Sequence, residues 1–301
     1  MVEPYWALAL VCLGWGLKRV GAMRADAAVA LNAYVVTVAL PALVLLRLPG
    51  LRLNAEAIVP AVTPWLLLAL SALAVLGLSR VFSWSRGVTG CLLLTVPLGN
   101  TSFLGFPLVE AWFGPEPVVY AMIYDQLGTF PLLASYGAII LATYAHGERP
   151  GPLGIAKRIL VFPPFVALLA GLALHGVVWP EAISGLLERV GNSLMPVVML
   201  AVGLQLEPRL SRDLWAPMGL GLGLKLLAAP LLFGLVGAAM GLAGIGFEVS
   251  VFEAGMGSMI TAGALAASAG LAPRLAAAMV GVSIPLSFVT LPLIHALFVA
   301  R

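Results

Sequence analysis

The stretch GNTSFLGFPLVE, at residues 99–110, places polar and helix-disrupting residues inside an otherwise apolar segment. Pro107 lacks a backbone N–H and frees a carbonyl one turn back, while Gly99 and Gly105 lower the cost of unwinding the helix. Three side chains with donors and acceptors come just before that break: Asn100, Thr101 and Ser102. A half-helix that begins there would direct free N–H groups and the positive end of its dipole at an anion. By itself the stretch indicates either an anion-binding site or a Pro-kinked packing helix.

A second stretch with the same small and polar character, EAGMGSMITAG, occupies residues 253–263 and falls at the matching place in the other half of the chain. Paired interruptions at corresponding positions are typical of the substrate site of a secondary transporter. This counterpart therefore favours binding over the alternative of tight helix packing through small residues. We predict substrate contacts at Asn100, Thr101, Ser102, Gly105, Pro107, Gly257, Ser258 and Thr261.

Three ionisable residues lie inside apolar segments, where a charge is costly and marks a candidate for function. Asp125 has Thr129 one turn on along the same helical face, and Lys225 lies in the middle of GLGLKLLAAPLL. Glu253 precedes the second break, whereas Glu110 is expected at the membrane interface. We predict that Asp125, Lys225 and Glu253 couple ion or charge movement to binding. The structural alternatives are an Asp125–Lys225 ion pair between helices and a Lys225 side chain that reaches a lipid headgroup.

The remaining residue types argue against other classes of function. The sequence has no nucleophile elbow, zinc helix motif or phosphate-binding loop, so we expect the protein not to be an enzyme. The histidines and the two cysteines, Cys12 and Cys91, do not pair at metal-ligand spacing. No metal or cofactor is therefore predicted, and Na⁺ or H⁺ is the candidate coupling ion. The net charge of +3 reflects lysines and arginines in the loops, not a nucleic-acid-binding surface.

The elements that must position these residues are membrane-spanning helices. Of the 301 residues, 61% are hydrophobic and only 10% are charged, and the mean hydropathy is +1.07, unlike a soluble domain. A helix that crosses a bilayer needs about 20 mainly apolar residues. The sequence predicts an all-α polytopic protein with ten spans, near residues 4–20, 25–47, 58–80, 87–111, 117–143, 155–178, 183–206, 213–240, 245–270 and 275–299.

Loop charges and internal similarity predict how the spans are arranged. The odd-numbered loops carry eleven Lys and Arg residues and the even-numbered loops three, so the odd loops should be cytoplasmic and both termini outside or periplasmic. A hydrophilic boundary divides the chain into halves of five spans each, 1–150 and 151–301. Because five is odd, a duplicated second half would enter the membrane from the opposite face, as an inverted repeat. Two weak echoes support the repeat: Pro41 in span 2 corresponds to Pro196 in span 7, and TFPLL in span 5 to TLPLI in span 10.

Several of these motifs together resemble the auxin efflux carrier family, which includes PIN-type carriers and PIN-like bacterial permeases of the bile-acid/arsenite/riboflavin transporter type. The motifs run in order along the whole chain: LNAYVVTVALPALVLL with Pro41, GNTSFLGFPLV, the span-5 Asp125, the span-8 KLLAAPLL and EAGMGS. The resemblance implies two inverted five-helix repeats, with spans 4 and 9 crossing near the bilayer midplane as broken helices. It also implies a scaffold of spans 1, 2, 6 and 7 and a transport domain of spans 3–5 and 8–10. Gly257 stands where the family usually has a proline, so the second break is expected to be softer or displaced.

Residues and resemblance together predict a secondary active transporter that moves a small organic anion, a carboxylate, across the cell inner (plasma) membrane by alternating access. The first alternative is a Na⁺/H⁺-type cation exchanger on a similar inverted-repeat fold, with Asp125 as the ion carrier. The second is a membrane receptor that uses the same pocket without transport. The expected partners are a small organic acid and the lipid bilayer, with no nucleic acid, and a homodimer is left open as the assembly.

Overall fold

The computed structural model describes residues 3–24, 26–50, 55–145, 160–205 and 214–299, together with Leu153 and Lys157. Across these residues the protein is helical, and no strand forms beyond one isolated antiparallel bridge between Gly99 and Ser258. The predicted boundary between the two halves, at residues 150 and 151, lies outside the described residues.

Six helical stretches are long and apolar enough to cross a membrane, and they confirm a multi-pass membrane protein. They are Ala27–Arg47, Ile58–Val81, Val118–Tyr144, Glu181–Gln205, Trp215–Ala239 and Pro273–Phe298. The other four predicted spans coincide with shorter or interrupted helices, so a total of ten spans stays a prediction. These helices are α1 (Glu3–Arg19), α5 (Arg86–Thr95) with α6 (Phe106–Phe113), α11 (Pro163–Ala173), and α16 (Ile245–Ala254) with α17 (Ile260–Ser268).

Prolines explain most of the irregular turns inside the long helices. A proline has no N–H to donate, and its ring displaces the carbonyl four residues earlier, so the preceding turn widens. Four of the five π-helical turns in the described chain end two residues before a proline. These turns are Val35–Ala39 before Pro41, Thr101–Gly105 before Pro107, Asp125–Thr129 before Pro131, and Leu224–Ala228 before Pro230. The fifth is Leu133–Gly137.

The same turns divide the long stretches into shorter helices. Their bounds are α2 (Ala27–Tyr34), α3 (Leu40–Arg47), α4 (Ile58–Val81), α7 (Val118–Tyr124), α8 (Phe130–Leu132), α9 (Ala138–Tyr144), α12 (Glu181–Asn192), α13 (Leu194–Gln205), α14 (Trp215–Gly223), α15 (Ala229–Ala239) and α18 (Pro273–Phe298).

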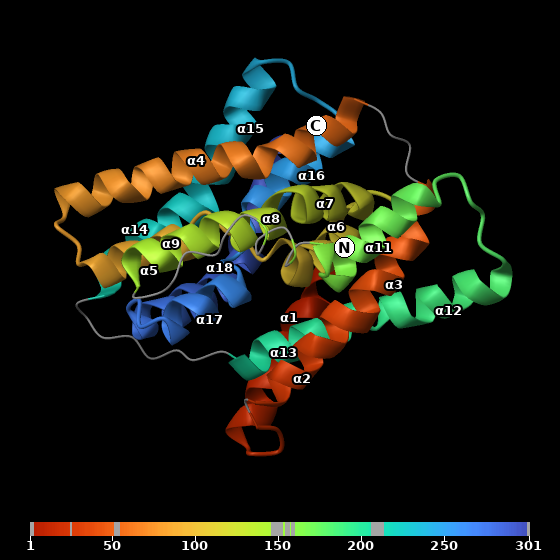
Figure 1. Ribbon diagram of the computed structural model, residues 1–301, viewed down its shortest axis with the longest axis horizontal. Coiled ribbons are helices and arrows are strands. Elements are labelled where there is room, and N and C mark those ends of the chain that lie inside the picture. The colour runs from red at the N-terminus through yellow and green to blue at the C-terminus, as the bar shows by residue number, and fades with distance from the viewer. Residues whose placement is uncertain are drawn as a thin grey trace.

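The helices pack as two groups. In one, α1 and α2 lie against α13, and α3 lies against α11 and α12. In the other, α5 packs on α4, α9, α17 and α18, and α14 packs on α18. Figure 1 shows α3 and α12 toward one end of the molecule and α5, α14 and α17 toward the other, with α7 and α16 between them. The interrupted segments around α6 and α16 therefore lie near the middle of the molecule, where the groups meet.

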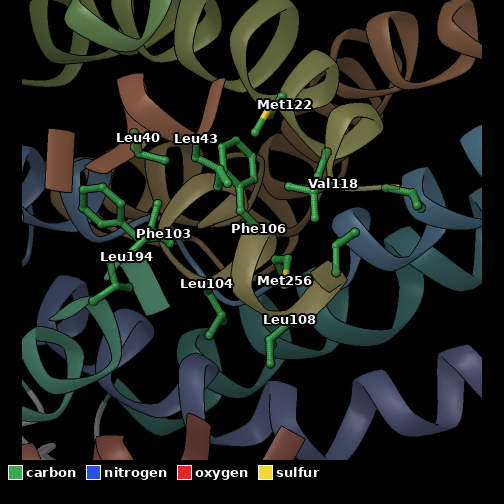
Figure 2. Close-up of a cluster of buried hydrophobic side chains, with 14 of the residues drawn as sticks. Leu40, Leu43, Phe103, Leu104, Phe106, Leu108, Val118, Met122, Leu194 and Met256 are labelled. Carbon is green, nitrogen blue, oxygen red and sulfur yellow. The ribbon is translucent and has the colours of Figure 1, made fainter. Parts of the chain in front are cut away.

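A core of buried apolar side chains joins the two groups (Figure 2). Leu40 and Leu43 of α3 belong to the first group, and they share this core with Phe106 of α6 and Met122 of α7. Leu194 at the start of α13 also contributes. A second core lies wholly within the second group, among α5, α17 and α18. The contact between the groups is thus a hydrophobic seam that runs beside the first interrupted segment.

Two glycines let α1 and α13 approach closely. A Cβ placed on Gly203 would overlap the carbonyl oxygen of Val11 and lie 2.8 Å from the backbone nitrogen of Trp15. Gly14 faces it across the helix pair, since a Cβ there would overlap the carbonyl oxygen of Leu200. Close backbone approach at small residues is a usual way for helices to associate in a membrane, so this contact fixes one helix pair of the first group.

Candidate functional site

The two interrupted segments that the sequence singles out meet in space and pair antiparallel. The N–H of Asn100 donates to the carbonyl of Gly257 at 2.8 Å, and the N–H of Met259 donates to the carbonyl of Leu98 at 2.9 Å. These bonds surround the bridge between Gly99 and Ser258. The backbone groups that are released where α5 and α16 end are therefore partly satisfied by each other, as non-helical backbone at membrane depth requires.

Residues Thr101–Gly105 begin the helical turn that follows the first break. The carbonyl of Asn100 accepts from the N–H groups of Leu104 and Gly105 at 3.1 and 3.0 Å, so the new helix starts here. The first N–H groups of a helix have no partner within it, and they carry the positive end of its dipole. Pro107 is buried two residues after this turn, and because it has no N–H it leaves a carbonyl of the turn without its usual partner.

Asp125 is held by hydrogen bonds to neutral side chains. Thr101 Oγ1 donates to Asp125 Oδ1 at 2.6 Å, and Gln126 Nε2 donates to Asp125 Oδ2 at 2.7 Å. Asp125 is only 2% exposed. Within the described chain no ion pair joins Lys225 to an acid, so the structural alternative of an Asp125–Lys225 ion pair is wrong. The physical reason is that the π-helical turn at Asp125 aims its carboxylate at Thr101, and the hydroxyl occupies one of its oxygens.

Lys225 and Glu253 lie against the two glycines of the first interrupted segment. A Cβ placed on Gly99 would lie 2.9 Å from Lys225 Nζ. A Cβ placed on Gly105 would overlap the carboxylate oxygens of Glu253 and lie 2.8 Å from its Cδ. Glu253 is close enough to interact electrostatically with both Asp125 and Lys225. The three predicted charged residues are therefore brought together around one helical turn, and the glycines make room for two of them.

Several buried polar atoms around this turn find no hydrogen-bond partner among the described residues. They are Asn100 Nδ2, Gln126 Oε1, Ser258 Oγ and both carboxylate oxygens of Glu253. Their residues are at most 2% exposed. A buried polar group without a partner costs about 1–3 kcal/mol, and more if it is charged. Most buried polar atoms in folded proteins are satisfied, so a cluster of unsatisfied ones indicates a place that a ligand can complete.

Gly257 allows the second segment to lie directly on α18. A Cβ at this position would stand 3.1 Å from the Cα and N of Ile284 and from the carbonyl carbon of Ser283. In the next residue, the N–H of Ser258 donates to Ser283 Oγ at 2.8 Å. The second break thus lies against a neighbouring helix backbone, where any side chain would crowd it.

The other predicted residues differ in how close they lie to the site. Ser102 is partly buried and its side chain lies near the Asp125 carboxylate. Thr261 is exposed in the first turn of α17, outside the buried cluster. Glu110 of α6 pairs with Arg47 of α3, with 3.6 Å between Oε1 and Nη2. Thr129, which follows Asp125 by one helical turn, is buried, with 3% of its surface exposed.

Two residues at the site were not singled out from the sequence. Gln126 follows Asp125 directly and donates to its carboxylate, and Ser283 accepts from the second broken segment. Both are polar residues within apolar stretches, so the signal that identified Asp125 was present in weaker form. Glycine and proline also lie close to both residues, with Gly128 and Pro131 after Gln126 and Gly281 and Pro285 around Ser283, so that part of the signal was available as well.

The arrangement can bind small charged groups of either sign. Lys225, the amide of Asn100 and the helix N-terminus offer donors, and the Glu253 carboxylate and the carbonyl of Gln126 offer acceptors. In the described part of the chain no three His, Cys, Asp or Glu residues gather in a way that could hold a metal ion.

Comparison with known proteins covers both interrupted segments. A family model described as a membrane transport protein matches residues 7–152 and 153–295. An uncharacterized transporter of Methanothermobacter thermautotrophicus is 32% identical over 295 residues, which cover 95% of this chain and 94% of the relative. An uncharacterized transporter of Methanocaldococcus jannaschii is 28% identical over 216 residues, which cover 67% of each chain.

Proposed function

The chain belongs to the membrane transport protein family, that of the auxin efflux carriers and PIN-like permeases, and from this we propose that it is a secondary transporter of a small organic carboxylate. It would act in the cell membrane without chemical conversion of its substrate. The substrate would bind where the two interrupted segments pair. Asn100, Thr101, Ser102, Gly105 and Pro107 would supply one side of the site, and Gly257, Ser258 and Thr261 the other.

The observation that carries this proposal is the pairing of two broken helices beside unsatisfied buried polar atoms. The backbone bonds between Asn100 and Gly257 and between Met259 and Leu98 hold the segments together. The unsatisfied amide of Asn100 belongs to one of the paired segments, and the unsatisfied hydroxyl of Ser258 belongs to the other. A carboxylate placed here would accept hydrogen bonds from both and would face the N-terminus of the turn at Thr101.

The proposed mechanism is alternating access by movement of one helix group against the other. The chain would form two inverted five-helix repeats, with a scaffold of spans 1, 2, 6 and 7 and a transport domain of spans 3–5 and 8–10. The two observed helix groups and the hydrophobic seam between them support this division, since apolar side chains can slide without losing directional bonds. Both termini would lie outside the cytoplasm.

Asp125, Lys225 and Glu253 would determine which charge crosses together with the substrate. Burial of all three beside the binding segment supports this role. Asp125 and Glu253 together carry more formal negative charge than Lys225 neutralises, so an accompanying Na⁺ or H⁺ would offset the charge of an anionic substrate. Exchange of cations alone is the second candidate, because the same excess of carboxylate would attract a cation in the absence of substrate.

The test is transport in proteoliposomes with a panel of small carboxylates under imposed Na⁺ and proton gradients. We expect substrate-dependent flux that is lost in Asn100→Ala and retained in the matched control Asn192→Ala, an exposed amide at the end of α12. Thermal stabilisation by a carboxylate without flux under any gradient would indicate a receptor instead. Na⁺ or H⁺ flux without any carboxylate would indicate the cation exchanger.

A further inference from the structure

We propose that the transported carboxylate is a zwitterion: a small molecule that also carries an ammonium group, as an amino acid does, with Glu253 as the ammonium acceptor. This inference rests on the proposed transport function and names the substrate class of the same site. It follows from the kinds of buried atoms that lack partners, because these include acceptors as well as donors.

The acceptor is Glu253 and not Asp125. Both oxygens of Asp125 already accept hydrogen bonds, from Thr101 and Gln126. Glu253 is fully buried, and neither of its carboxylate oxygens finds a donor among the described residues. A carboxylate in this condition lacks the donors that normally accompany buried charge. An ammonium group has three N–H donors and a positive charge, so it supplies both missing features.

The donors lie at the other end of the same turn. Asn100 Nδ2 and Ser258 Oγ are unsatisfied and buried, and Lys225 Nζ lies beside Gly99. With the helix N-terminus these groups match a carboxylate. The carbonyl of Gln126 is a second unsatisfied acceptor, held in place because its amide group donates to Asp125.

The spacing of the two ends fits a short zwitterion. Asn100 precedes the turn Thr101–Gly105, and Glu253 lies against Gly105 at its end. A single helical turn therefore separates the donors from the acceptor. A ligand that bridges them must carry its two charged groups close together, as an amino acid does with one carbon between them.

Charge balance points in the same direction. With all three groups ionised, the cluster would hold two carboxylates and one ammonium, and each residue is at most 4% exposed. A simple carboxylate would add a second uncompensated negative charge to a buried site, where like charges repel strongly. A zwitterion adds no net charge, because it brings its own cation and places it against Glu253.

The experiment compares matched probes on the purified full chain in proteoliposomes and in thermal unfolding. The probes are a mixture of the proteinogenic L-amino acids, the corresponding deaminated acids, and the corresponding decarboxylated amines. We expect the amino acids to be transported and to stabilise the protein, and each of the other two mixtures to bind more weakly by about tenfold or more. Glu253→Gln should remove the preference for amino acids over deaminated acids. Glu248→Gln, the same change on the same helix and away from the broken segment, should retain it.

The probes alone decide the proposal if Glu253→Gln does not fold. Transport of deaminated acids as efficient as that of amino acids would overturn the zwitterion and leave the proposed carboxylate transport intact. Amines that bind as well as amino acids would also overturn it. A folded Glu253→Gln that keeps the preference would refute the role of Glu253. Absence of flux and stabilisation with every probe would overturn both the inference and the proposed function.

Discussion

Replacement of Thr101 by valine tests the idea that Asp125 is held in place by neutral donors. Thr101→Val keeps the branched shape of the side chain and removes the hydroxyl that donates to Asp125 at 2.6 Å. A hydrogen bond to a charged group contributes about 1.5–3 kcal/mol. Since Asp125 is 2% exposed, water cannot easily replace the lost donor. We therefore expect Thr101→Val to lower the free energy of unfolding by about 1.5–3 kcal/mol.

Thr95→Val is a matched control in the preceding helix. Thr95 is equally buried, but its hydroxyl donates at 2.9 Å to the carbonyl of Cys91 in its own helix. Loss of such a neutral bond costs about 0.5–1.5 kcal/mol, so the two variants should differ by about 1–2 kcal/mol. Thermal and denaturant unfolding in detergent would measure the difference, and substrate flux should fall in Thr101→Val only. Equal destabilisation by both substitutions would refute the reasoning that Asp125 depends on Thr101.

Two further predictions concern glycines at close contacts. Gly257→Ala should lower the free energy of unfolding by about 1–3 kcal/mol, because its Cβ would stand 3.1 Å from the backbone of Ile284. Unfolding in detergent measures this loss. An unchanged free energy of unfolding would show that α18 moves aside without cost. Gly203→Ala should cost a similar ~1–3 kcal/mol, because its Cβ would overlap the carbonyl oxygen of Val11. Gly16 in the facing helix α1 is the control, because a Cβ there meets nothing within 4 Å. Gly16→Ala should raise the free energy of unfolding by up to about 1 kcal/mol. Equal changes of unfolding temperature in Gly203→Ala and Gly16→Ala would contradict the close approach of α1 and α13.

Much of the secondary structure could be predicted from local sequence. The apolar stretches predicted helices, and six of them are long enough to cross a membrane. The sequence also indicated the place of each break, since the first helix ends before Gly99 and the second ends before Gly257. These features depend on residues within one stretch, namely apolar runs, glycines and prolines. The widened turns before Pro107 and Pro131 were not predicted, although the same local cause explains them.

The sequence proposed residues for the site, whereas their contacts came only from the structure. Asp125, Lys225 and Glu253 were proposed as costly charges in apolar stretches, and Asn100 as a polar residue before a helix break. Their role in binding stays a prediction. An Asp125–Lys225 ion pair was considered because opposite charges in a membrane usually pair, yet Asp125 bonds to Thr101 and Gln126 instead. The direction of a side chain across a helix interface depends on rotation and register of both helices, which periodicity within either one does not specify.

The sequence by itself therefore determined that this is a helical membrane protein, and it indicated two glycine-containing stretches beside which α5 and α16 end. Apolar composition and proline chemistry act over a few residues, so they can be read without knowledge of the fold. Only the tertiary structure decided that Glu253 lies against Gly105 with no donor, that Lys225 lies beside Gly99, and that Gly257 rests on α18. These contacts join segments that are far apart in the chain. Which polar groups are satisfied and which are left to a ligand depends on how the helices pack.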